Sequence, residues 1–84
     1  MTAKEMFEKL GYEKVNLAPL LWQFNDGGYI KNIEFSNILQ RISFSSYEYY
    51  NDGKPIEENY INISELKAIN QQVKELGWIE SEVN

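Results

Sequence analysis

The sequence predicts an α+β domain: an N-terminal helix, an antiparallel meander sheet of three to four strands, and a C-terminal helix. The two helices are expected to pack on one face of the sheet. Two observations favour this class. Helical patterns near both ends of the chain stop at Leu-Gly-aromatic, in residues 6–12 and 72–78. Between them, apolar and polar residues alternate as they do in half-buried strands. A chain of 84 residues fits a single domain over 1–84.

The first helix is predicted over residues 3–10. Thr2 and Glu5 have the spacing of a capping box, in which each side chain accepts a hydrogen bond from the backbone amide of the other residue. Gly11 can adopt the left-handed conformation that ends a helix, and Tyr12 should then close over the last turn. A helix of about two turns is marginal alone, so packing must hold it.

The middle of the chain predicts a sheet. Three segments show strand-like alternation: residues 20–24, 29–36 and 38–47. Residues 25–28, Asn-Asp-Gly-Gly, are the strongest turn signal. Residues 13–19 show no period and are expected to be irregular. After a second turn at 51–55, residues 57–63 are expected to add a short edge strand.

Each predicted strand has one face for the core and one for solvent. The expected core-facing side chains are Leu20, Trp22, Phe24, Tyr29, Lys31, Ile33, Phe35, Ile38, Ile42 and Phe44. Ile30, Leu39 and Arg41 fall on the opposite, solvated face. An apolar patch there would mark a partner or homodimer surface.

The last helix is predicted to begin at Ser64 as its N-cap, with Glu65 near the positive end of the helix dipole. Its expected core stripe has spacings of 3, 4 and 3 and consists of Leu66, Ile69, Val73 and Leu76. Gly77 should end the helix, with Trp78 closing over it. Residues 79–84 are expected to be a frayed acidic tail.

Composition excludes several kinds of chemistry. The chain has no cysteine and no histidine, so it lacks thiol nucleophiles, zinc–thiolate sites and the commonest general base. The net charge is −5 and the cationic residues are scattered, so direct nucleic-acid binding is not expected. There is no apolar run of about 20 residues and no apolar signal sequence, which favours a cytoplasmic protein without a membrane span.

Acidic residues offer two alternative sites. The turn at 25–28 could begin a calcium loop, but only one carboxylate precedes its glycines, and a hairpin turn is the better interpretation. A second acidic stretch is expected to be a solvated edge rather than an acid–base pair; it comprises Glu48, Asp52, Glu57 and Glu58. No catalytic residue, cofactor or metal ligand is therefore predicted.

Residues 1–12, 27–35 and 63–78 resemble a group of small uncharacterised proteins encoded by phages and prophages of Gram-positive bacteria. The similar segments cover about half of the chain and consist of helix caps and core stripes. The resemblance implies an α+β fold, a phage or prophage origin and a location in the bacterial host cell. It implies no catalytic residues and no activity.

Tyrosines are the predicted interface residues, because tyrosine is enriched in binding hot spots. The candidates are Tyr47, Tyr49, Tyr50 and Tyr60. Ordinary aromatics at a strand end are the alternative interpretation. The favoured function is a non-enzymatic phage accessory protein that binds a protein partner or a second copy of itself. The alternatives are an acidic nucleic-acid mimic that inhibits a nuclease or defence complex, a self-associating structural component, and an enzyme acting through carboxylates, tyrosines or a bound metal.

Overall fold

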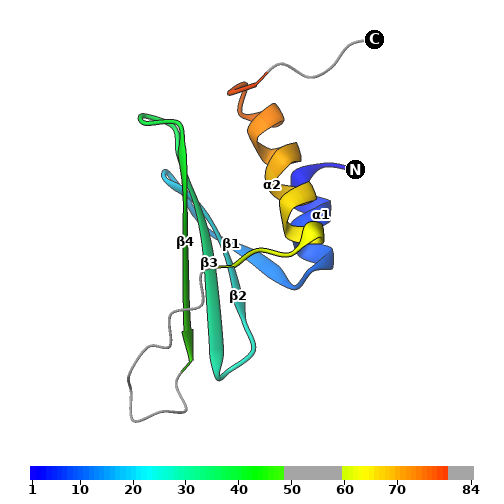
Figure 1. The fold of residues 1–84 in the computed structure, drawn as a ribbon, viewed down its shortest axis with the longest axis vertical. Helices are drawn as coiled ribbons and strands as arrows, with labels where there is room; N and C mark the ends of the chain where they lie inside the picture. The colour runs from blue at the N-terminus through cyan, green and yellow to red at the C-terminus, as the bar shows by residue number, and fades with distance from the viewer. Residues whose placement is uncertain (49–59, 80–84) are drawn as a thin grey trace.

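The computed structural model describes residues 1–48 and 60–79. Its elements are α1 (Ala3–Lys9), β1 (Tyr12–Leu17), β2 (Leu20–Asn25), β3 (Tyr29–Ser36), β4 (Arg41–Glu48) and α2 (Ile63–Glu75). The strands form one antiparallel sheet in the order β1-β2-β3-β4, which is a meander. Both helices lie on the same side of this sheet (Figure 1). The predicted α+β class and layout are confirmed.

The first strand was not predicted. Residues 13–19 were expected to be irregular, but Tyr12–Leu17 form β1 and pair with β2. The strand β1 lies at the edge of the sheet, and only its first residue, Tyr12, is buried. Its sequence therefore shows no apolar alternation. Its register shifts between Lys14 and Asn16, which also disturbs the period. Backbone pairing with β2 therefore creates a strand that side-chain patterning does not reveal.

The predicted edge strand at 57–63 is wrong for residues 60–63, the part of it that lies within the described residues. Residues 60–62 have no regular structure and Ile63 is the first residue of α2, while 57–59 and the turn at 51–55 lie outside the described residues. The strand predicted over 38–47 begins three residues later, at Arg41. Residues 37–40 form a turn in which Gln40 has a positive φ of 48°.

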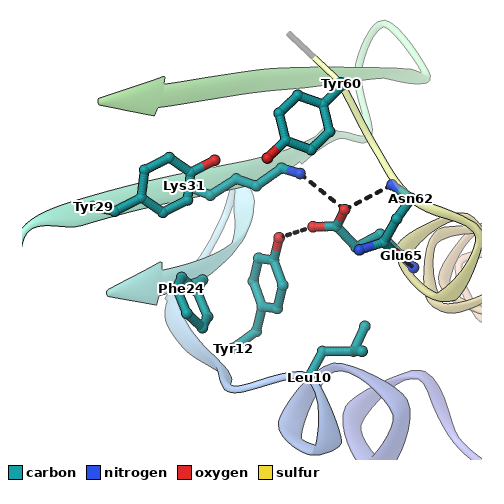
Figure 2. A pocket seen from close by; sticks show the side chains of 8 residues that line it. All are labelled: Leu10, Tyr12, Phe24, Tyr29, Lys31, Tyr60, Asn62 and Glu65. Carbon is teal, nitrogen blue, oxygen red and sulfur yellow. Dashed lines mark hydrogen bonds and ion pairs between the residues drawn. The ribbon is translucent and has the colours of Figure 1, made fainter. Parts of the chain in front are cut away.

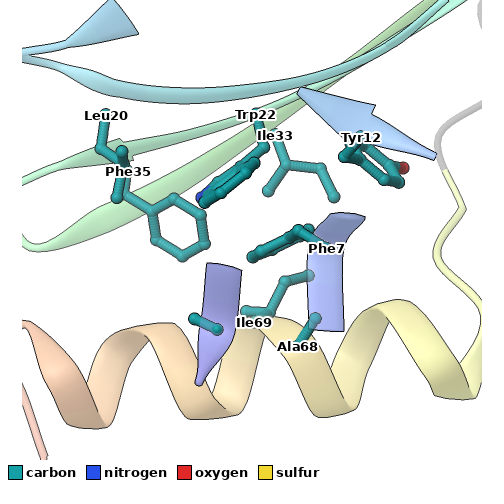
Figure 3. Close-up of a cluster of buried hydrophobic side chains, with 9 residues drawn as sticks. Phe7, Tyr12, Leu20, Trp22, Ile33, Phe35, Ala68 and Ile69 are labelled. Carbon is teal, nitrogen blue, oxygen red and sulfur yellow. The ribbon is translucent and has the colours of Figure 1, made fainter. Parts of the chain in front are cut away.

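The core lies between the sheet and the two helices (Figure 3). Its centre is a stack of Phe7 from α1 on Trp22 from β2, with ring centroids 4.8 Å apart, and the Tyr12 ring meets Phe7 edge-on at 5.5 Å. The other buried apolar side chains are Ala3, Leu20, Ile33, Phe35, Ala68 and Ile69. The predicted core faces of β2 and β3 are thus confirmed. On β4, Ile42 is half-buried, whereas Phe44 is 38% exposed on the edge strand.

The start of α2 differs from the prediction. Asn62, not Ser64, is the N-cap: its Oδ1 accepts a hydrogen bond from the Glu65 amide at 2.8 Å. The Glu65 carboxylate in turn accepts a hydrogen bond from the Asn62 amide at 2.9 Å. This reciprocal capping box needs a Glu three residues after the cap, which Asn62 has and Ser64 lacks.

The buried face of α2 is more polar than expected. Leu66 is 47% exposed, so its assignment to the core stripe is wrong, whereas Ile69 is buried. The buried side chains of the helix are Glu65, Ala68, Ile69 and Gln72. Gln72 accepts a hydrogen bond from the Trp22 indole at 3.0 Å, so a polar residue replaces an apolar one in the interface with β2. Val73 and Leu76 are half-buried against the core.

The helix ends follow the predicted rules. Thr2 and Glu5 form the expected capping box at α1. At the end of α2, Gly77 has a φ of 77° and the Trp78 amide donates to the Val73 carbonyl at 3.0 Å, as in a Schellman motif. The Glu75 carboxylate accepts from the Ala3 amide at 2.7 Å, which joins the end of α2 to the start of α1.

Candidate functional site

A charged cluster is buried where α2 meets the sheet (Figure 2). Lys31 of β3 and Glu65 of α2 form an ion pair of 2.8 Å, and each side chain is 6% exposed. The Tyr12 hydroxyl donates to the other carboxylate oxygen of Glu65. Together with the Asn62 amide, these donors occupy both oxygens of Glu65. We call Tyr12, Lys31 and Glu65 the buried cluster.

The buried cluster adjoins a pocket of about 190 Å³ that is walled by aromatic rings. The Tyr60 ring covers Lys31, with Nζ 4.5 Å from the ring centroid. The hydroxyl of Tyr29 is buried and has no hydrogen-bond partner among the residues that the structure describes. Phe24 and Leu10 complete the apolar part of the wall.

Two groups of this cluster, Glu65 and Tyr12, are each held in one protonation state. Burial alone would raise the pKa of Glu65, but the hydrogen bonds from Lys31 and Tyr12 outweigh it and hold that pKa below its ordinary value. Burial, reinforced by the neighbouring Glu65 carboxylate, raises the pKa of the Tyr12 hydroxyl far above its usual value. At neutral pH the carboxylate is therefore ionised and the phenol is protonated, and neither is poised to exchange a proton.

The predicted tyrosine candidates do not form one surface. Tyr47 pairs with Ile30 in the sheet and is 39% exposed on the face opposite the helices. Tyr60 is 55% exposed and covers Lys31 on the helix side. Tyr49 and Tyr50 lie outside the described residues. An interface role for these four tyrosines stays a prediction.

The sheet face opposite the helices is largely polar. The Gln23 side chain donates to Asn32 at 2.9 Å, and Asn32 donates to Ser45 at 3.3 Å, which makes a cross-strand row over β2, β3 and β4. Ile30 lies on this face, as expected, but it is only partly exposed. Leu39 lies in the turn before β4 instead.

The strongest exposed apolar feature lies at one end of the sheet. The turn between β1 and β2 and the turn between β3 and β4 lie at the same end (Figure 1), which we call the hairpin end. Here Leu17 is 76% exposed, Ile38 94% and Leu39 60%. Such concentrated exposure of large aliphatic side chains is typical of an interaction site.

A groove of about 370 Å³ runs between these two turns. Its apolar lining includes Leu17, Pro19, Leu20, Phe35 and Ile38. Two charged residues, Glu34 and Arg41, also line it, and neither forms an ion pair within 1–48 and 60–79. The Trp78 indole donates to Asn37 at 2.7 Å, which connects the β3–β4 turn to the end of α2.

Sequence reasoning missed the hairpin end because it assigned Ile38 and Leu39 to a strand. Two consecutive aliphatic residues after Asn37 interrupt strict alternation, and that interruption was the available signal. The predicted hairpin turn at 25–28 is confirmed: Asp26 Oδ1 accepts from the Gly28 and Tyr29 amides. The Asp26 carboxylate therefore stabilises the turn by accepting its backbone hydrogen bonds. Within the described ranges, no group of three or more acidic residues could hold a metal ion.

The predicted acidic edge made of Glu48, Asp52, Glu57 and Glu58 lies outside the described residues, apart from the backbone of Glu48 at the end of β4. No helix in the described part of the chain is long and apolar enough to cross a membrane.

Comparison of the chain with known protein families, with curated proteins and with solved structures finds no match.

Proposed function

We propose that this chain is a non-enzymatic protein-binding domain whose binding surface is the hairpin end. The observation that carries the proposal is the exposure of Ile38, of which 94% is open to solvent beside an apolar groove. Leaving a large aliphatic side chain in water costs about 1.5–3 kcal/mol relative to burying it. Leu17 and Leu39 add to this unburied area, and a partner that covers all three would bind through the hydrophobic effect.

The buried cluster supports the non-enzymatic part of the proposal. Its carboxylate has each oxygen engaged by donors from the chain itself, and the Lys31 ammonium is held between Glu65 and the Tyr60 ring. A general acid or base needs a pKa near the working pH and access to a substrate proton. The directions of the shifts at Glu65 and Tyr12 are opposite to that need.

The test is photocrosslinking from the proposed surface. A photoreactive amino acid replaces Ile38 in one variant and Lys67, an exposed residue of α2, in the control. Both proteins are irradiated in cells of the source organism, and the adducts are identified by mass spectrometry. We expect one protein to be crosslinked by the variant at 38 and not by the control. Equal or absent crosslinking from both positions would overturn the proposal.

A matched pair of substitutions measures the contribution of the surface. Ile38→Asp places a charge at the hairpin end, whereas Ile63→Asp adds the same charge at the start of α2, where the residue is 67% exposed. We expect Ile38→Asp to weaken partner binding at least about tenfold, because a desolvated carboxylate would face an apolar surface. Ile63→Asp should bind like the wild type. Similar affinities for the two variants would place the surface elsewhere.

The finer parts of the functional prediction remain expectations from the sequence. They are the phage or prophage origin, the bacterial cytoplasmic location, and the alternative of an acidic nucleic-acid mimic. Salt dependence separates that alternative from ours. A mimic should lose affinity steeply as salt rises, whereas binding through Leu17, Ile38 and Leu39 should change little.

A further inference from the structure

We infer that the partner of the hairpin end is a second copy of the chain, bound in an isologous, two-fold symmetric pair. This inference rests on the proposed function, which it deepens by naming the partner. In such a pair every residue that contacts its counterpart's surface is itself contacted in the same way. The surface must therefore be complementary to itself, and a projecting group beside a recess that can receive it meets this condition.

The hairpin end carries both shapes. Ile38 stands on the turn between β3 and β4 and is almost fully exposed. Beside it, the groove of about 370 Å³ is lined by Leu17, Pro19 and Leu20 from the neighbouring turn and strand. A two-fold rotation would place Ile38 of each copy in the groove of the other. Both apolar surfaces would then be removed from water at once.

The groove also carries two opposite charges, so the surface is complementary to itself in charge as well as in shape. Glu34 and Arg41 both line it, and neither has an ion-pair partner in the described residues. A surface with one carboxylate and one guanidinium can pair with itself, since rotation brings Arg41 of one copy toward Glu34 of the other. Arginine is also favoured in interfaces because its planar fork pairs with carboxylates through two hydrogen bonds. The two reciprocal pairs would fix the register of the dimer.

The first experiment measures the mass of the full chain in solution by sedimentation equilibrium over a range of protein concentrations. Because each copy has a net charge of −5, the buffer should contain about 0.15 M salt, at which repulsion is screened beyond about 8 Å. We expect twice the mass of one chain for the wild type and for Ile63→Asp, and the mass of one chain for Ile38→Asp. A wild type with the mass of one chain at its highest soluble concentration would overturn the inference.

The second experiment exchanges the charges. Arg41→Glu and Glu34→Arg should each be monomeric alone, because each two-fold pair would contain like charges facing each other. An equimolar mixture should restore the dimer, since opposite charges then meet at both contacts: the two introduced side chains at one, and the unchanged Glu34 and Arg41 at the other. This rescue cannot arise from misfolding, because mixing would not refold a damaged chain. A mixture that stays monomeric, or variants that dimerise alone, would overturn the assigned pairing.

The outcomes separate this inference from the proposed function. A monomeric wild type that is crosslinked through position 38 to another protein would overturn the second copy and retain the binding domain. Crosslinking through position 38 to the chain itself, together with the doubled mass, supports both. A doubled mass that Ile38→Asp does not change would place the self-association on another surface and overturn the inference.

Discussion

At the scale of single residues, the Glu65 side chain joins the start of α2 to two strands of the sheet. It caps the start of α2, pairs with Lys31 of β3 and accepts the hydroxyl of Tyr12 of β1. A buried carboxylate is tolerated only when its charge and its lone pairs have partners. Here the partners come from two strands and from the backbone at the start of α2. The geometry explains why a charged residue occupies a core position of α2.

Glu65→Gln is therefore expected to be costly. It leaves the buried Lys31 ammonium without a counter-charge, and breaking a buried ion pair typically costs about 3–5 kcal/mol of unfolding free energy. Glu8→Gln, at an exposed position of α1, is the matched control and should change stability by less than about 0.5 kcal/mol. Urea denaturation of both variants measures the difference. Equal, small losses would show that the pair contributes little to the fold.

Only half of this arrangement could be predicted from the sequence. Alternation in residues 29–36 correctly placed Lys31 on the core face beside Ile33 and Phe35. Its partner lies 34 residues further along the chain, and no local pattern connects two positions at that separation. Glu65 was instead interpreted through the helix dipole, which explains its preference for the first turn but not its burial.

At the scale of elements, the cap of α2 decides where the helix starts. Asn62→Ala should lower the unfolding free energy by about 1 kcal/mol, since it removes the side-chain acceptor for the Glu65 amide. Ser64→Ala, the residue that the sequence favoured as cap, should change it by less than about 0.5 kcal/mol. Thermal or urea unfolding of the two variants measures both values. A larger loss of unfolding free energy for Ser64→Ala than for Asn62→Ala would show that Ser64 is the N-cap.

The two helix-ending glycines offer a second comparison. Gly77 has a φ of 77° and open space where a Cβ would be, so Gly77→Ala should cost about 1–2 kcal/mol from backbone strain alone. At Gly11, with a φ of 91°, a Cβ would also come within 3.0 Å of the Phe24 ring. Gly11→Ala should therefore cost more than Gly77→Ala. Unfolding free energies from chemical denaturation measure both losses, and the reverse order would contradict this account.

Elements with strong local signals were predictable, and those held by their neighbours were not. Capping residues and glycine stops located both helices to within one or two residues, and alternation located β2 and β3. The edge strand β1 was missed because only Tyr12 is buried there. The start of β4 was misplaced because Ile38 is apolar yet lies in a turn, a position that local patterning assigns to the core.

At the scale of the whole molecule, stability should depend on pH through Glu65. Its pKa is lowered in the folded state, so the unfolded chain binds a proton at a pH where the folded chain does not. The stabilisation is complete above the unfolded pKa of about 4.3 and is lost as the pH falls through the folded pKa. Urea denaturation across this range should show a steeper fall for the wild type than for Glu65→Gln. Parallel stability–pH profiles for the wild type and Glu65→Gln would show that Glu65 does not cause the pH dependence.

The hairpin end could not be located from the sequence, because it depends on how the meander brings two turns together. The β1–β2 turn and the β3–β4 turn are about 20 residues apart in the chain, yet the two antiparallel strands between them, β2 and β3, bring both turns to the same end of the sheet. The tyrosine-based prediction used the enrichment of tyrosine in binding sites and the local alternation around Tyr47, and neither assigns Tyr47 and Tyr60 to the two faces of the sheet. Only the register of β3 with β4 does so for Tyr47.

The order of the elements along the chain, with α2 after all four strands, has a consequence for folding during synthesis. Lys31 and Trp22 belong to strands that leave the ribosome before α2 does, and α2 carries their buried partners, Glu65 and Gln72. Until then, the inner face of the sheet has a charge without its counter-ion and an indole without its acceptor. The native core can therefore form only after α2 has been synthesised.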